Sequence, residues 1–182
     1  MKQEFTLTIY SENRVGLLSQ ITTVFTRRHI NIESLTTSES AIKGIHKFTI
    51  VVFSTREDIE KLVRQIEKRI DVLKAYVFAQ DEIVHQEVAL YKVPTEALLN
   101  GNDVEYLVRK YSARILEMTP EYTVIEKTGH KAETQELFDK LDPYGVTQFT
   151  RSGRVAVNKL KQEPLTDFLR KLEEDTLKKN DF

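Results

Sequence analysis

A short turn near the amino terminus holds the residues best suited to binding a small molecule. Residues 13–16, Asn-Arg-Val-Gly, follow a strand-like segment and come directly before an amphipathic one. Free backbone N–H groups at the start of a helix attract an anion such as a carboxylate. Gly16 has no Cβ, so the backbone there can approach a ligand closely. The Asn13 amide both donates and accepts hydrogen bonds, which suits the ammonium and carboxylate groups of an amino acid.

A second pair of candidate residues lies at the far end of the same amphipathic segment. Asn31 and Ile32 begin the next strand, about three helical turns from Gly16, which is too far to share one ligand within a single chain. They could share one only across a dimer, in which one chain supplies the helix start and its neighbour the strand. Two interpretations stay open: an amino-acid site between two chains, and a plain turn with a helix cap.

The sequence contains no comparable group of residues that could carry out catalysis. The four histidines lie outside the spacings that bind metals or activate a nucleophile. The chain has no cysteine, which excludes disulfides, thiolate catalysis and cysteine-based metal sites. Gly16 lacks the further glycines of a phosphate-binding or dinucleotide-binding turn. We therefore expect a non-catalytic chain that holds no cofactor or metal of its own.

Composition and charge narrow the class of partner. The 182 residues are 40% hydrophobic and 30% charged, and the net charge of −1 gives no general attraction for nucleic acid or anionic membranes. The amino-terminal MKQEFTLTIY lacks the basic start and apolar core of a signal peptide. No apolar run approaches the roughly 20 residues that span a bilayer. We therefore expect a cytoplasmic protein without nucleic-acid or membrane partners.

The elements that position the turn follow a βαββαβ order. Phe5, Leu7 and Ile9 alternate with threonines, which predicts a half-buried strand. An apolar stripe over residues 17–25 predicts a helix. The remaining predicted elements are strands at 30–40 and 45–53, a helix over 59–70 and a strand at 72–78.

The same order recurs in the second half of the chain. Its predicted elements are strands at 87–93, 113–118 and 122–128, helices around 104–111 and 137–141, and extended segments at 146–153 and 154–157. One common RNA-binding module shares this order, but it needs aromatic residues in a glycine-containing segment of the third strand. The third strand here, IHKFTIVVF, has no such context, which disfavours RNA binding.

These patterns predict an α+β protein with two tandem ferredoxin-like βαββαβ domains. We expect a first domain over residues 1–79, a linker around 79–86, a second domain over 85–160, and a carboxy-terminal helix with a polar tail over 161–182. The helix is expected to pack on the second domain. Because each unit buries only a modest core, we also expect an oligomer.

Specific motifs resemble one family in both halves of the chain. The stretch RVGLLSQITTVFTRRHINIESL, residues 14–35, resembles the start of the small regulatory subunit of acetohydroxyacid synthase, also called acetolactate synthase, which begins with an ACT domain. EVALYKV, RILEMTPEYTVIEKTG and FTRSGRVAV resemble the carboxy-terminal domain of that family. The resemblance spans roughly residues 3–158, and NIESL together with TRSG is its most specific part.

The resemblance implies a regulatory partner of an enzyme. Such a subunit activates a separate catalytic subunit, which uses thiamine diphosphate, FAD and magnesium to join pyruvate to pyruvate or 2-oxobutyrate. It also confers feedback inhibition by branched-chain amino acids, most often valine and otherwise leucine or isoleucine. A stand-alone ACT-domain sensor of amino acids remains the alternative, and a gene neighbour encoding a thiamine-diphosphate synthase would favour the regulatory subunit.

The resemblance also implies an effector site at the interface of an ACT-domain homodimer. The corresponding residues here are Asn13, Arg14, Val15, Gly16, Leu17 and Leu18 of one chain, with Asn31 and Ile32 of the other. Arg14 departs from the family pattern, which often has a smaller or acidic residue in the turn. A small ferredoxin-like hydrolase such as an acylphosphatase is disfavoured, because the turn has Arg14 but no glycine-rich loop around it to bind phosphate.

Overall fold

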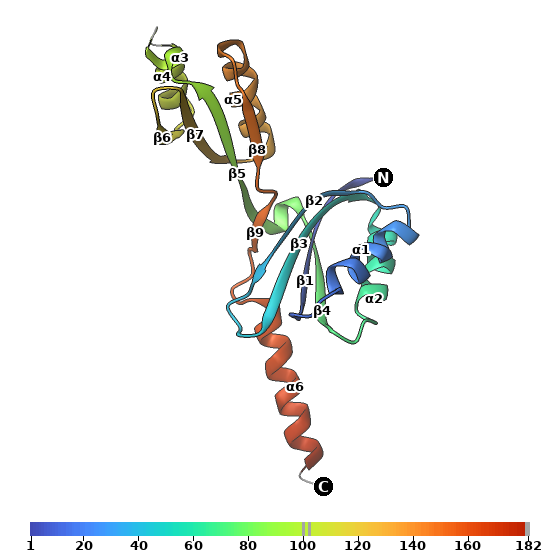
Figure 1. Cartoon of the computed structure of the whole chain (residues 1–182). Helices are drawn as coiled ribbons and strands as arrows, with labels where there is room; N and C mark the ends of the chain where they lie inside the picture. The colour runs from blue at the N-terminus through green and yellow to red at the C-terminus, as the bar shows by residue number, and fades with distance from the viewer. Residues whose placement is uncertain (100, 102, 181–182) are drawn as a thin grey trace. The chain divides into compact units, whose positions relative to one another are not determined.

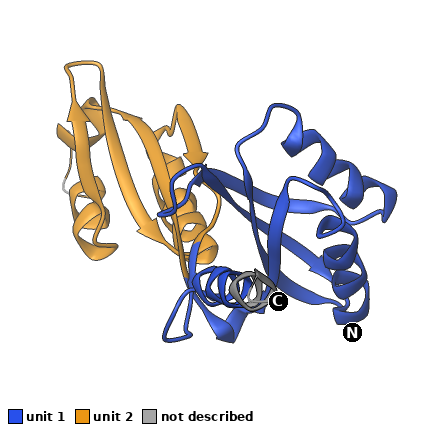
Figure 2. Ribbon diagram, turned by 90° about the horizontal axis from the view of Figure 1, so that it is seen from below, with its two compact units in different colours: residues 1–84, 156–182 blue, residues 85–155 orange. Residues whose placement is uncertain are grey.

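The computed structural model describes residues 1–99, 101 and 103–180, without the side chains of residues 175–180 (Figure 1). The chain divides into two compact units (Figure 2). Residues 1–84 and 156–182 form the first unit, and residues 85–155 form the second. The carboxy-terminal segment therefore belongs with the amino-terminal sheet.

The first unit is a four-stranded antiparallel sheet with two helices on one face (Figure 1). The strands run in the order β2-β3-β1-β4. Its elements are β1 (Gln3–Glu12), α1 (Leu17–Arg27), β2 (Ile32–Glu39), β3 (Ile45–Ser54), α2 (Arg56–Ile66) and β4 (Val72–Ala79).

The alternating apolar residues of β1 and the apolar stripe of α1 pack in one core. Phe5, Leu7 and Ile9 are fully buried beneath α1 and α2. From the helices, the core receives Leu17, Ile21, Val24, Phe25, Ile59, Leu62 and Ile66. A side-chain cap marks the start of α2, where the Thr55 hydroxyl accepts a hydrogen bond from the backbone N–H of Asp58.

The second unit repeats the topology of the first. Its strands run β6-β7-β5-β8, and β9 pairs with β5 outside this path. Its elements are β5 (Ile83–Pro94), which begins at the end of the first unit, α3 (Glu96–Leu99), α4 (Asp103–Lys110), β6 (Arg114–Met118), β7 (Tyr122–Gly129), α5 (Lys131–Leu141) and β8 (Gln148–Arg151). β9 (Val155–Asn158) lies almost entirely among residues of the first unit. The prediction of an α+β fold with two βαββαβ units is confirmed.

The segment expected to be a linker is already structured. A single 3-10 turn, η1 (Gln80–Glu82), leads directly into β5, and a second, η2 (Asp142–Tyr144), follows α5. Ile83, His85 and Glu87 are buried on alternate positions of β5. The linker prediction was wrong because two of these three buried side chains are polar, which hides the period-2 pattern of the strand.

The carboxy-terminal helix α6 (Pro164–Asn180) extends beyond the apolar stripe that predicts it. Its first turn packs against the face of the first sheet that the other helices leave open. Tyr76 donates its hydroxyl to the backbone oxygen of Pro164 at 2.9 Å, and Leu165 is fully buried. The expected packing on the second domain was therefore wrong. Residues 181 and 182, the end of the predicted polar tail, lie outside the described residues.

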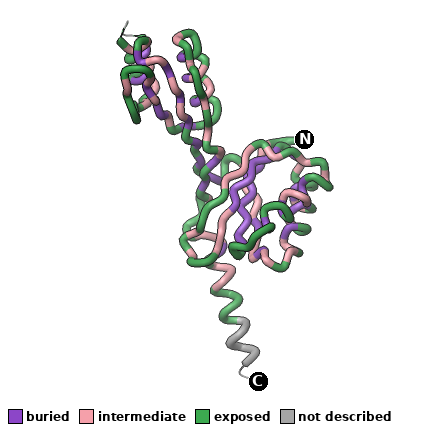
Figure 3. Tube along the Cα trace, in the orientation of Figure 1, coloured by how far each residue is buried: buried purple, intermediate pink, exposed green. Residues whose placement is uncertain are grey.

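Burial along the chain shows that this face is closed (Figure 3). Thr6, Thr8 and Tyr10 alternate with the core residues of β1, yet all three are buried. The Tyr10 hydroxyl donates to a carboxylate oxygen of Glu163 at 2.5 Å. The Lys47 ammonium group donates to the backbone oxygen of Ala156 at 3.3 Å. The carboxy-terminal segment is thus an integral layer of the first unit.

Candidate functional site

The turn before α1 is shaped by its backbone. Gly16 is the residue preceding the helix and has φ of 86° and ψ of −9°, in the left-handed region. A Cβ at Gly16 would meet no atom within 4 Å, so the conformation, rather than crowding within the chain, requires glycine. Open space above the turn is what a ligand approaching the backbone would need.

The start of α1 is electrostatically open. Among the described residues, no side chain caps this helix, and its first turn contains no acidic residue. Gln20 donates its N–H to the backbone oxygen of Gly16 at 3.1 Å, which begins the regular helical bonding. The N–H of Leu17 donates to the backbone oxygen of Arg14 at 3.3 Å. The N–H groups that follow it in the first turn lie at the positive end of the helix dipole, where an anion is favoured.

Arg14 is held by two carboxylates. Its guanidinium lies 2.9 Å from a carboxylate oxygen of Glu12 and 3.1 Å from one of Asp71. These ion pairs tie the turn to the end of β1 and to the loop before β4. Because both partners are anionic, they compete with an incoming carboxylate for the Arg14 charge.

Apolar side chains at the helix start divide into two kinds. Leu17 is buried in the core, so its side chain is not accessible to a ligand. Val15 is fully exposed, and Leu18 is 43% exposed. The turn therefore presents N–H groups next to two exposed branched aliphatic side chains.

Asn31 and Ile32 lie at the opposite end of α1, as the sequence predicts. The Asn31 amide donates to a carboxylate oxygen of Glu33 at 3.0 Å, and the side chain is exposed. Ile32 is half-buried against the core, and a bulge follows it before Ser34. An 11-residue helix is about 16 Å long, so one chain does not bring Asn31 to Gly16.

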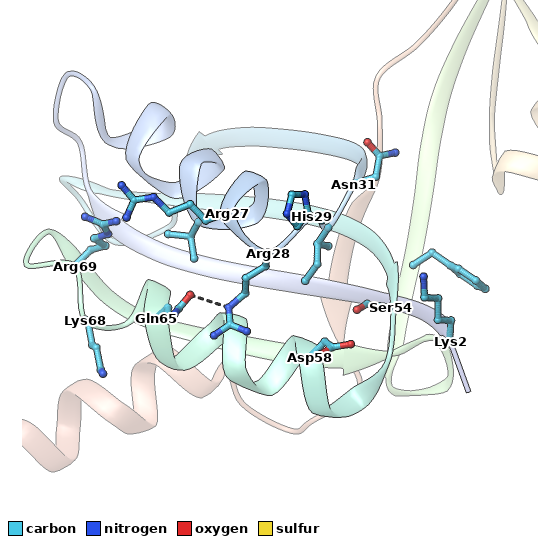
Figure 4. A pocket seen from close by; sticks show the side chains of 13 residues that line it. Lys2, Arg27, Arg28, His29, Asn31, Ser54, Asp58, Gln65, Lys68 and Arg69 are labelled. Atoms are coloured by element: carbon cyan, nitrogen blue, oxygen red, sulfur yellow. Dashed lines mark hydrogen bonds between the residues drawn. The ribbon is translucent and has the colours of Figure 1, made fainter.

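A hollow of about 840 Å³ opens between the carboxy-terminal end of α1 and the length of α2 with the turn after it, from Asp58 to Arg69 (Figure 4). Its lining includes six basic side chains, which define the basic groove: Lys2, Arg27, Arg28, His29, Lys68 and Arg69. From the sequence, Arg27-Arg28 and Lys68-Arg69 appear as two solvated helix ends. The available signal was that the predicted topology places both helices on one face of the same sheet.

The described part of the chain contains no candidate metal site. No group of three or more histidine, aspartate or glutamate side chains there could hold a metal ion. Within the same residues, no helix combines the length and the apolar character needed to cross a membrane.

Comparison with known proteins covers both units. The model of the acetolactate synthase small-subunit-like ACT domain matches residues 7–74, and that of the small subunit of acetolactate synthase matches residues 86–160. The small subunit from Bacillus subtilis is 35% identical over 157 residues, covering 86% of this chain and 90% of that protein. The one from Mycolicibacterium smegmatis is 32% identical over 154 residues, covering 85% and 90%.

A solved structure agrees with these sequence matches. The crystal structure of the acetolactate synthase small subunit from Thermotoga maritima has a TM-score of 0.80 and 26% identity, covering 88% of this chain and 99% of that one. The family models and this structure together account for both βαββαβ units. The chain therefore belongs to the family of acetolactate synthase small subunits and is a regulatory subunit with an ACT domain.

Proposed function

We propose that this chain activates the catalytic subunit of acetolactate synthase and makes it sensitive to feedback inhibition by a branched-chain amino acid, with valine as the first candidate. The observation that carries the effector site is the uncapped start of α1 beside the left-handed Gly16. The thiamine diphosphate, FAD and magnesium of the reaction belong to the catalytic partner. This chain contributes binding and regulation.

The arrangement of the first sheet supports a dimer that completes the effector site. β2 is an edge strand within the unit, and an edge strand can pair with a second copy. Glu39, at the end of β2, pairs with His46, and His46 pairs with Ser11, next to the turn. Two β2 edges joined antiparallel around a two-fold axis would therefore bring the Asn31 end of one chain to the Gly16 end of the other.

Such a dimer would offer a complementary group to each part of valine. The N–H groups of the first turn of α1 suit the carboxylate, and the amides of Asn13 and the partner copy's Asn31 suit the ammonium group. Val15 and Leu18 supply exposed aliphatic surface for the branched side chain. Charge-assisted hydrogen bonds of this kind contribute roughly 1.5–3 kcal/mol each.

The test mixes the purified chain with its catalytic subunit and measures acetolactate formation with and without valine. We expect a several-fold rise in rate on mixing, inhibition by valine, and no turnover of pyruvate by this chain alone. Gly16→Asp and Asn13→Ala should each raise the valine concentration for half inhibition about tenfold, which corresponds to about 1.4 kcal/mol. Activation should persist in both variants.

Gly145→Asp is the matched control for the glycine substitution. Gly145 also has a positive φ, 84°, but lies in the second unit, where a Cβ would make only ordinary contacts with Pro94 at 3.8 Å. Unchanged inhibition in folded, dimeric Gly16→Asp and Asn13→Ala would refute the site. Valine binding without any effect on the catalytic subunit would instead support a stand-alone amino-acid sensor.

A further inference from the structure

The basic groove concentrates positive charge that the described part of the chain leaves uncompensated. Lys2, Arg27, Arg28, Lys68 and Arg69 line it, and none of the five forms an ion pair with a described carboxylate. Asp58 is the one acidic side chain among the described lining residues, and it already accepts a hydrogen bond from the Thr55 hydroxyl at 2.7 Å.

The basic side chains elsewhere on α2 differ from those of the groove because they form ion pairs. Basic side chains along the exposed face of that helix are paired: Arg56 with Glu60 at 2.9 Å, Lys61 with Glu57 at 2.5 Å, and Arg64 with Glu60 at 3.9 Å. Arg27 and Arg28 lie at the carboxy-terminal end of α1, and Lys68 and Arg69 follow that of α2, where the helix dipoles favour positive charge. The charge of the groove is therefore available to an external anion.

The layout of the groove fits an extended acidic segment better than a small anion. Arg27 and Arg69 lie at one end, Arg28 in the middle and Lys2 at the other end (Figure 4). Among the described residues, Arg28 is the one basic side chain of the groove with a hydrogen bond to a neighbour, since its Nε donates to the Gln65 side-chain oxygen at 2.7 Å. A compact anion site would instead direct several fixed donors at one point.

The floor of the groove adds an apolar component. Val24, Ile30 and Phe53 contribute to the lining, and Phe53 is 56% exposed. An exposed aromatic ring in the lining of a groove with flexible cations suits a peptide that carries both acidic and apolar side chains. Asn31 also lines the groove, so the effector residue of the proposed dimer borders this surface.

We propose that the basic groove docks an acidic segment of the catalytic subunit, with carboxylates on the arginine and lysine side chains and an apolar residue against Phe53. The proposal rests on the proposed function, because it assigns the surface through which this chain meets its partner. Docking at the end of α1 that carries Asn31 would place the partner next to the effector site.

The experiment compares a double charge reversal with a matched control. Arg28→Glu combined with Lys68→Glu reverses two positions in the groove, and Arg64→Glu reverses one exposed position of α2 outside it. Association with the catalytic subunit is measured by sedimentation, and activation by titration of this chain. We expect the double variant to raise the half-activating concentration at least tenfold and Arg64→Glu to change it less than twofold.

Salt provides a second readout that a folding defect would not reproduce. Raising ionic strength should weaken association of the wild-type chain, because exposed charges are screened beyond about 8–10 Å. The double variant should lose most of this salt dependence. The neutral pair Arg28→Gln with Lys68→Gln should fall between the two and serves as the second variant if the reversal impairs folding in urea titrations.

Three outcomes would overturn the proposal. If the wild-type chain activates and the double variant does so equally at every salt concentration, the groove is not the docking surface, while the proposed function stands. If inorganic tripolyphosphate binds the wild-type chain but not the double variant and activation is unaffected, the groove is a small-anion site. If the two wild-type subunits do not associate at all, the docking proposal and the proposed function both fail.

Discussion

The two sheets have the same strand order, but their outer faces, turned away from the main helices, are built differently. In the first unit, Thr8, Tyr10 and Val51 are buried there, and the carboxy-terminal segment lies against this face. In the second unit, Val88, Arg114 and Thr128 remain exposed on the corresponding face. A repeated topology therefore does not determine which faces of a sheet are closed.

The chemistry of each face matches its environment. The rings of Tyr10 and Tyr76 contact edge to face, with their centroids 6.2 Å apart. Their hydroxyls donate hydrogen bonds to the Glu163 carboxylate and to the backbone oxygen of Pro164, respectively. The second outer face instead carries an ion pair between Arg114 and Glu126, and the Thr128 hydroxyl donates to Glu126 at 2.6 Å. Arg114 and Thr128 remain exposed around the buried Glu126, whereas the aromatic face of the first sheet is covered.

The cover lies beyond the region that the family model matches. The family model of the second domain ends at residue 160, and the Thermotoga maritima structure covers 88% of the chain while being itself covered to 99%. The buried Leu165 and the hydrogen-bonded Glu163 lie after the end of that family match. The residues that close the first sheet thus follow the matched domains in the sequence.

Deleting residues 159–182 should have the largest effect on this difference between the sheets. The first unit would lose about 4 kcal/mol of stability, because a buried leucine contributes roughly 1.5–3 kcal/mol and each of two hydrogen bonds about 1 kcal/mol. Hydrogen exchange should accelerate in β1, β3 and β4. Equal acceleration in β5 and β7 would show that the segment does not serve the first sheet alone.

Leu165→Ala should cost the first unit about 3 kcal/mol, because a fully buried leucine leaves a cavity when truncated. Urea unfolding resolved by unit provides the measurement. Leu160→Ala is the matched control, since Leu160 is 63% exposed and its truncation should change stability by less than about 0.5 kcal/mol. Similar losses from both would contradict a packed cover.

Tyr10→Phe should cost about 1.5 kcal/mol at neutral pH, because the Glu163 carboxylate loses its donor. Burial and the hydrogen bond to Glu163 raise the pKa of Tyr10, and burial raises the pKa of Tyr76 to about 12. The folded unit therefore retains phenolic protons that the unfolded chain releases from about pH 10.

This protonation difference makes stability fall as pH rises from about 10 toward 12, after being fully present below pH 10. Tyr10→Phe and Tyr76→Phe should each make that fall shallower in urea titrations across this range. A fall of unchanged slope in both variants would mean that neither hydroxyl is protected by the cover.

Thr128→Val should have the smallest effect, about 1 kcal/mol or less on the second unit, because it removes one hydrogen bond at an open face. The Thr128 hydroxyl, and then Arg114, lower the pKa of the Glu126 carboxyl. The resulting stability is present above the ordinary carboxyl pKa and is lost as pH falls through the lowered value. The variant should lose less stability on acidification, and NMR titration of Glu126 should show a higher pKa.

The sequence alone was sufficient for both βαββαβ series, because the side-chain periods of strands and helices are local properties. The alternation at Phe5, Leu7 and Ile9 predicts the core face of β1, and the structure buries all three. The turn of residues 13–16 was also identifiable, since Gly16 adopts the left-handed conformation that favours glycine. Its role in effector binding stays a prediction.

Tertiary structure alone decided what covers each face and which charges meet. Tyr10 occupies an outward position of an ordinary alternating strand, and its burial depends on Glu163, 153 residues later. Arg27-Arg28 and Lys68-Arg69 are typical helix ends in sequence, yet the fold brings them to one groove. A local period indicates which side of its own element a residue faces, but only long-range packing determines what lies opposite.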